Sequence, residues 1–235
     1  MASRQEEKER RRLERLEREE AERKAAARRK RLQLVFGGLL AAALVAVVVV
    51  GIMSATGGDP EEEVAGEGRA PTANVSLPEP QETDLQAAAD AAGCTLEHPP
   101  IEGAGHDDRD FTPDDYETNP PTSGDHNPDW YDDGVYEPGN VPRLGMLVHT
   151  LEHGRINVQY ASGTPQSEVD RLEAFVAEKT GYHILLYENT TDMPYQVAAT
   201  AWGHKLGCEE MNDQVFDALR TFYDRYVDKG PERVP

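Results

Sequence analysis

One short run of the sequence combines the residue types of a metal site, namely His149-Thr150-Leu151-Glu152-His153. Two histidines four positions apart share one face of a helix, and they also share one face of a strand because four is an even number. Glu152 joins that face only if the run is helical. The order H-x-x-E-H is the inverzincin pattern, in which two histidines bind zinc and the glutamate acts as general base. The run therefore predicts a metal site, and metal-dependent hydrolysis is one activity it could support.

The residues around this run limit its structure. Gly154 follows directly, and the β-prone Ile156, Val158 and Tyr160 come next, so a helix here would end at once. We predict either two short strands, over 146–149 and 155–160, or a helical turn followed by a strand. A catalytic zinc also needs a third protein ligand and a cleft, and the five-residue pattern supplies neither.

A second histidine lies in a loop that its prolines make rigid. The loop reads Pro120-Pro121-Thr122-Ser123-Gly124-Asp125-His126-Asn127-Pro128-Asp129-Trp130. It could present His126 to a metal, or it could pack Trp130 and use His126 as a hydrogen-bond bridge. A third group, Trp202-Gly203-His204 near Cys208, is open to the same two interpretations.

We predict from these groups a metal site made of His126, His149 and His153, with Glu152 as a fourth ligand or as a partner of the ligands. Three imidazoles suit Zn²⁺ or Cu²⁺, and Met146 beside them would favour copper. The alternative is that the same side chains only fasten a long loop to the sheet through hydrogen bonds, since a folded loop must satisfy its backbone groups.

Two cysteines, Cys94 and Cys208, could close nearly the whole domain into one loop. An even pair in an oxidising compartment predicts a disulfide, worth about 4 kcal/mol in the chain-entropy model. A redox or metal-thiolate pair is the alternative, although neither cysteine belongs to a C-x-x-C motif.

Charge divides the chain sharply. The whole chain holds 24 Lys and Arg and 44 Asp and Glu. Residues 1–33 carry 13 of the basic residues and 8 of the acidic ones, which leaves 11 basic and 36 acidic residues in the rest of the chain. A field of that sign repels nucleic acid and attracts cations or basic partners. We therefore predict no nucleic-acid partner for the acidic part.

An uncharged apolar run from Leu32 to Met53 is long enough to cross a bilayer. A cleaved signal peptide is the alternative, but the charged region before it is long and Ser54-Ala55-Thr56 is a poor cleavage site. We predict a basic cytoplasmic helical tail over 1–31, a transmembrane helix over 32–54 and a flexible stalk over 55–83. The protein would then be a single-pass protein of the cell membrane, bound to the lipid bilayer, with an extracytoplasmic domain over 84–235.

This domain is predicted to be α+β, with a small, mostly antiparallel sheet, two or three helices and a long ordered loop. Helices are expected over 84–92, from Thr164-Pro165 to Gly181 and over 212–227, and strands over 182–187 and 197–202. Residues 98–142 hold too many breakers for regular structure, so we predict that they wrap around the core, anchored by Tyr116, Trp130, Tyr131 and Tyr136.

Four motifs carry a family resemblance: Tyr116-x-Thr-x-Pro-Pro-Thr-Ser-Gly-x-His-x-Pro-x-Trp, Gly134-x-Tyr136, His149-x-Leu-Glu-His-Gly and Ala201-Trp202-Gly203. Together they resemble the family catalogued as domain of unknown function 3105, over roughly Gly93 to Val227. The resemblance implies a membrane-anchored extracytoplasmic domain and transfers no reaction. We therefore expect a binding or interaction module rather than an enzyme, one that binds zinc or copper or serves as a scaffold for a protein partner in the membrane or envelope.

Overall fold

The computed structural model describes residues 64–66 and 68–233. Within them the elements are β1 (Val64–Gly66), α2 (Leu85–Ala92), β2 (Cys94–Glu97), a 3-10 turn (Pro113–Asp115), β3 (Trp130–Tyr131), β4 (Gly134–Val135), α3 (Leu144–Glu152), β5 (Ile156–Tyr160), α4 (Gln166–Glu178), β6 (Ile184–Glu188), β7 (Val197–Ala201), β8 (His204–Cys208) and α5 (Val215–Tyr226). The predicted tail and transmembrane segment, 1–31 and 32–54, lie outside the described residues. Among those that are described, no helix has the length and apolar character needed to span a bilayer.

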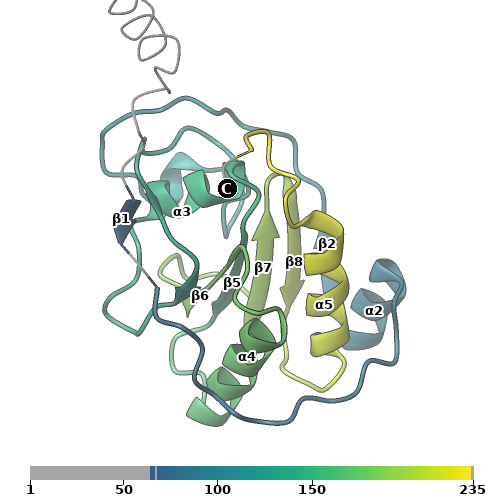
Figure 1. The fold of residues 1–235 in the computed structure, drawn as a ribbon. Helices are drawn as coiled ribbons and strands as arrows, with labels where there is room; N and C mark the ends of the chain where they lie inside the picture. The colour runs from purple at the N-terminus through teal and green to yellow at the C-terminus, as the bar shows by residue number, and fades with distance from the viewer. Residues whose placement is uncertain (1–63, 67, 234–235) are drawn as a thin grey trace, which may run out of the picture. The chain divides into compact units, whose positions relative to one another are not determined.

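The main sheet has six strands in the order β2-β8-β7-β5-β6-β4 (Figure 1). The pairs β2–β8, β8–β7 and β7–β5 are antiparallel, whereas β5–β6 and β6–β4 are parallel. Short strands β1 and β3 form a separate parallel pair. The prediction of a mixed α+β domain with a mostly antiparallel sheet is confirmed, but the described part holds four α-helices where two or three were expected.

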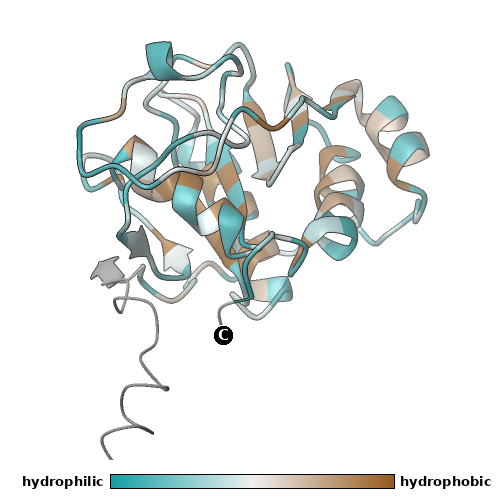
Figure 2. Cartoon of the chain, turned by 90° about the horizontal axis from the view of Figure 1, so that it is seen from above, coloured by the Kyte–Doolittle hydropathy of each residue, from teal (hydrophilic) through white to brown (hydrophobic). Residues whose placement is uncertain are grey.

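Different layers cover the two faces of the sheet. Ile184 and Leu186 of β6 pack with residues of α2, α4 and α5, whereas Leu185 and Tyr187 pack with Leu147 of α3. This alternation follows from the two-residue period of a strand. Figure 2 shows the hydrophobic colour concentrated on the strands and on the inward sides of the helices. The helix α3 lies on this second side, and Phe111 and Tyr116 of the irregular segment 98–142 pack against Val148 of the same helix.

The helix α3 is the element that the sequence left undecided. Its residues from Gly145 to Glu152 are all buried, so the run lacks the alternation of polar and apolar faces that marks a surface helix. The helix ends where Gly154 adopts a left-handed backbone with φ of 81° and donates its N–H to the Leu151 carbonyl. This glycine allows the chain to pass into β5 within two residues. The helical interpretation was thus the correct one for the histidine run.

Other elements lie close to their predicted places. Asp84 accepts a hydrogen bond from the Ala87 N–H and begins α2, which ends at the left-handed Gly93. The helix α4 begins one residue later than expected, because Pro165 occupies its N-cap and the Thr164 hydroxyl bonds back to Ala161. The strands β2 and β8 were not predicted. They bring Cys94 opposite Cys208, and the predicted disulfide joins them.

A stretch predicted to end a flexible stalk is fastened to the domain. The Arg69 guanidinium binds the Glu173 carboxylate of α4 at 2.7 and 2.8 Å, and the backbone N–H groups of Thr72 and Ala73 donate to the same carboxylate. Further along, the N–H groups of Gln81 and Glu82 donate to Asp217 of α5. From Arg69 onward this extended chain is therefore part of the compact domain.

Removal of the disulfide tests how much this link contributes to stability. The cysteines are 114 residues apart, and closure of a loop of that length is worth about 4 kcal/mol in the chain-entropy model. The double variant Cys94→Ala/Cys208→Ala is expected to lose about that much free energy of unfolding in urea. Wild-type protein treated with a reductant should show a matching loss. A loss below about 1 kcal/mol would show that the sheet edge is stable without the link.

Glu173 should make stability depend on pH. Its side chain is 4% exposed, and hydrogen bonding from Arg69 outweighs burial and lowers its pKa from 4.5 to about 2. A carboxyl whose folded pKa is depressed contributes stability above its unfolded pKa and loses that contribution as pH falls through the folded pKa. Between pH 4.5 and 2 the wild type is expected to lose roughly 3 kcal/mol more than Glu173→Gln.

Urea unfolding at pH steps across that window measures the difference. Glu168→Gln is the matched control, because Glu168 lies on the same helix in a surface pair with Arg171 and such pairs contribute little. Parallel pH profiles for the wild type and Glu173→Gln would contradict the assignment.

Candidate metal centre

Two elements bring four potential ligands together. The helix α3 carries His149 and Glu152, which are three residues apart and therefore neighbours on its surface. The irregular segment carries His106 and His126, which face each other in an isolated parallel bridge. In that bridge the His126 N–H donates to Gly105 and the Asp107 N–H donates to the His126 carbonyl. The bridge holds the two loop histidines side by side over the helix.

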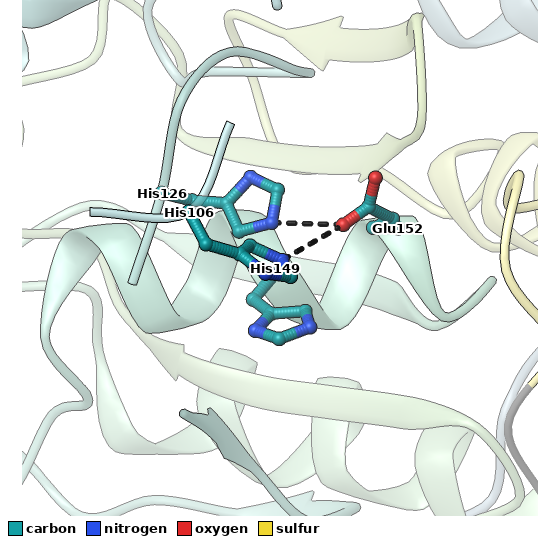
Figure 3. A group of neighbouring side chains, drawn as sticks. All are labelled: His106, His126, His149 and Glu152. Atoms are coloured by element: carbon teal, nitrogen blue, oxygen red, sulfur yellow. Dashed lines mark ion pairs between the residues drawn. The ribbon is translucent and has the colours of Figure 1, made fainter. Parts of the chain in front are cut away.

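The potential ligand atoms of the four side chains lie close together. One ligand atom from each of His106, His126, His149 and Glu152 lies within 4.8 Å of the others. The Glu152 Oε2 atom is 2.8 Å from His126 Nε2 and 3.5 Å from His106 Nε2. Figure 3 shows the carboxylate of Glu152 turned toward the imidazole rings. His126 and His149 are fully buried, whereas the His106 side chain is 36% exposed and forms the solvent side of the group.

Backbone carbonyl groups fix which nitrogen of each buried ring can act as a ligand. His126 Nδ1 lies 2.8 Å from the Gly124 carbonyl oxygen, and His149 Nδ1 lies 2.8 Å from the Asn127 carbonyl oxygen. A carbonyl only accepts, so each Nδ1 carries a hydrogen and the lone pair of the neutral ring lies on Nε2. Metal-binding histidines are oriented in this way by a hydrogen bond from the other ring nitrogen.

The contact between His126 and Glu152 does not have the geometry of an ordinary hydrogen bond. Both His126 Nε2 and Glu152 Oε2 are buried, and neither has a hydrogen-bond partner of ordinary geometry among the described residues, although they are only 2.8 Å apart. With a proton on Nδ1, the neutral form of the ring would turn a lone pair toward the carboxylate. Two acceptors this close repel each other unless a positive charge, either a second proton on the ring or a metal ion, lies between them or beside them. The donor set therefore fits a bound metal ion.

Burial sets the charges of the helix residues. Burial, with the nearby His126 and His106, lowers the pKa of His149 to about 3. Burial would raise the pKa of Glu152, but hydrogen bonding and positive charge from His126 in its protonated form, with the charge of protonated His106, outweigh burial and the net pKa is lowered. At neutral pH His149 is therefore a neutral imidazole and Glu152 an anion, which are the forms in which these side chains bind metals.

His153 belongs to a second group. Its ring lies 4.4 Å from the His149 ring, and together with Glu232 these residues make a second set of potential ligands. The Nε2 atom of His153 is 3.6 Å from Glu232 Oε2, and the Trp130 indole packs edge-on against the ring. Burial and the neighbouring His149 lower the pKa of His153 to about 3. The predicted set of three histidines is thus divided between two groups that share His149.

Sequence reasoning missed two potential ligands and left a third position open. His106 lies in a glycine-rich stretch, and only the tertiary bridge with His126 brings it to the centre. Glu232 follows the last helix, more than 70 positions from His153. His204 is not in either group, because its ring faces His98 and stacks on Tyr226. Its neighbour Trp202 does reach the centre, with the indole edge-on to His126 at 6.0 Å.

The fold and this cluster define a class of protein, an α+β domain whose buried histidines and glutamate could hold a metal ion. The chain belongs to the family described as protein of unknown function DUF3105, which it matches over residues 110–234. The predicted family resemblance is thereby confirmed. The match contains His126, His149, Glu152 and Glu232 and begins after His106. No curated protein and no solved structure matches the chain.

A glycine in α3 allows the loop to approach the helix. A Cβ atom at Gly145 would overlap the side chains of Asn127 and Phe111. In an uncrowded helix alanine is more favourable than glycine by about 1 kcal/mol, whereas crowding in a packed core costs about 1–3 kcal/mol. Gly145→Ala is therefore expected to lower the free energy of unfolding, measured in urea. An increase in the free energy of unfolding would show that the loop does not pack closely against α3 at Gly145.

Proposed function

We propose that this domain binds a divalent transition-metal ion through His106, His126, His149 and Glu152. The observation that carries the proposal is the buried contact of His126 Nε2 with Glu152 Oε2, two acceptor atoms that a cation would bridge. The backbone hydrogen bonds that place both lone pairs on Nε2 support it further. A ligand set fixed in advance by the fold binds its ion with less loss of entropy.

Zinc is the ion that this donor set suits best. Zn²⁺ binds imidazole nitrogen and carboxylate oxygen at about 2.0–2.2 Å, and ligands in a tetrahedron of that size lie roughly 3.4 Å apart. The contacts of Glu152 with His126 and His106, at 2.8 and 3.5 Å, lie on either side of that value. Cu²⁺ binds the same ligands and competes with zinc. Met146 would favour copper if its sulfur were a ligand. It is buried in α3, one turn before His149, and is not among the four donors proposed here.

Four protein donors would fill a tetrahedral zinc ion, as in structural sites, whereas catalytic sites keep a position open for water. In the hydrolase alternative, His149 and His153 would hold the metal and Glu152 would act as base. The arrangement favours the four-donor set over that alternative, because this set has one donor more than the group of His149, His153 and Glu232, and because a Glu152 oxygen lies among its donor atoms. The bound ion would fasten the irregular segment to α3.

We further propose that the domain lies outside the cell membrane, anchored by residues 32–54. The uncharged run from Leu32 to Met53 and the basic block before it support this topology. The disulfide between Cys94 and Cys208 supports an oxidising compartment. The acidic surface would attract cations or a basic protein partner in the membrane or envelope.

Titration of Zn²⁺ into the metal-stripped full chain, followed by calorimetry, tests the metal proposal. The wild type is expected to bind one ion. Glu152→Gln and His126→Ala should weaken binding by at least the roughly 10–100-fold that follows loss of an outer-shell partner. Bound zinc should also raise the free energy of unfolding by about 2.7 kcal/mol at a free concentration 100 times the Kd.

His204→Ala is the matched control, because His204 is a partly buried histidine in neither group of potential ligands. It should bind zinc like the wild type. Glu152→Gln keeps the shape of the side chain and separates loss of a ligand from loss of the fold, which circular dichroism reports. Wild-type protein that binds neither zinc nor Cu²⁺ would overturn the proposal and leave these histidines as hydrogen-bonding links.

A further inference from the structure

A surface pocket lies next to the metal centre. It has a volume of about 430 Å³, and both the buried His153 and the half-exposed Glu232 line it. Asp228 lines the same pocket, together with the cationic Lys229 and Arg233. His153 is also in ring contact with His149, a ligand of the proposed centre. A chain of ligand groups therefore runs from solvent to the centre, from Glu232 through His153 to His149.

The C-terminal segment holds Glu232 in this position. The Asp228 N–H donates to the Gly154 carbonyl at 2.9 Å, and the Glu232 N–H donates to the Glu152 carbonyl at 3.1 Å. Between them, a Cβ atom on Gly230 would overlap the Glu152 carbonyl oxygen, so only glycine allows this approach. The end of the chain thus returns to the C-terminal end of α3 (Figure 1). The Glu232 carboxylate is placed beside His153 by backbone hydrogen bonds.

The two groups of ligands exclude each other through His149. Its Nδ1 donates to the Asn127 carbonyl, so the ring has one lone pair, on Nε2, and can bind one ion at a time. An ion held by His149, His153 and Glu232 therefore competes with an ion held by His149, His126, His106 and Glu152. The second group has three protein donors, one of them half-exposed, against four donors in the first group.

We infer that His153 and Glu232 form a waypoint through which the metal ion is exchanged between solvent and the buried centre. The inference rests on the proposed metal binding and concerns the path that the ion takes. Glu232 captures the hydrated cation in the pocket, His153 replaces one of its waters, and transfer at His149 delivers the ion to the four-donor set. Release follows the same steps in reverse.

A waypoint lowers the barrier in both directions and leaves the affinity of the final site unchanged. In Glu232→Gln and in His153→Phe, which keeps a ring of similar size, loading and release should both slow on the order of tenfold. The Kd for Zn²⁺ should stay the same. The experiment uses stopped-flow mixing of the full chain with Zn²⁺ and a zinc-sensitive dye for loading, and excess chelator for release.

Asp228→Asn is the matched control, because it removes one carboxylate charge from the same pocket at a residue outside both ligand groups. Its rates should equal those of the wild type. Unchanged rates in Glu232→Gln and His153→Phe would overturn the inference. They would indicate that the ion enters beside the exposed His106 instead. A weakened Kd in these two variants would also overturn it, because they would then be ligands of the resting ion. A wild type that binds no zinc would instead overturn the proposed function itself.

Discussion

Apart from a 3-10 turn and the two-residue strands β3 and β4, the irregular segment 98–142 must satisfy its backbone hydrogen bonds without a helix or a sheet. The rest of this side of the domain is arranged around that requirement. Side chains supply the missing partners. The Glu102 N–H donates to the Ser123 hydroxyl, and the Gly105 N–H donates to the Asp125 carboxylate. The Asn127 amide donates to the carbonyl groups of Asp107 and Arg109. His149 then links the segment to α3 through the Asn127 carbonyl.

This requirement explains why histidine serves the site so well. Each imidazole has two ring nitrogens that point in different directions. In His126 and His149 one nitrogen satisfies a backbone carbonyl, and the other is turned toward the Glu152 side of the cluster. The structural role and the metal-binding role, which the sequence presented as alternatives, therefore use different atoms of the same side chains. A lysine or a glutamine could satisfy the carbonyl but would not offer a fixed nitrogen lone pair.

Elements whose ends are set by neighbouring residues could be predicted from the sequence. Elements that depend on contacts with distant parts of the chain could not. The capping residue Asp84 and the terminal Gly93 define α2 locally. The helix α3 is buried along nearly its whole length, so its pattern does not distinguish it from a buried strand. The pairing of β2 with β8 depends on residues more than 100 positions apart. His106 joins the centre for the same kind of reason, because its bridge to His126 leaves no signal in either segment alone.

Both tryptophans of the chain lie against histidines of the two ligand groups. The Trp202 indole is edge-on to His126, and the Trp130 indole is edge-on to His153 while Arg155 stacks on its ring. Tryptophan emission from this protein therefore originates beside the proposed centre and its pocket. The domain carries its own optical probe, with one fluorophore at each group, and a quenching ion would be visible without any added label.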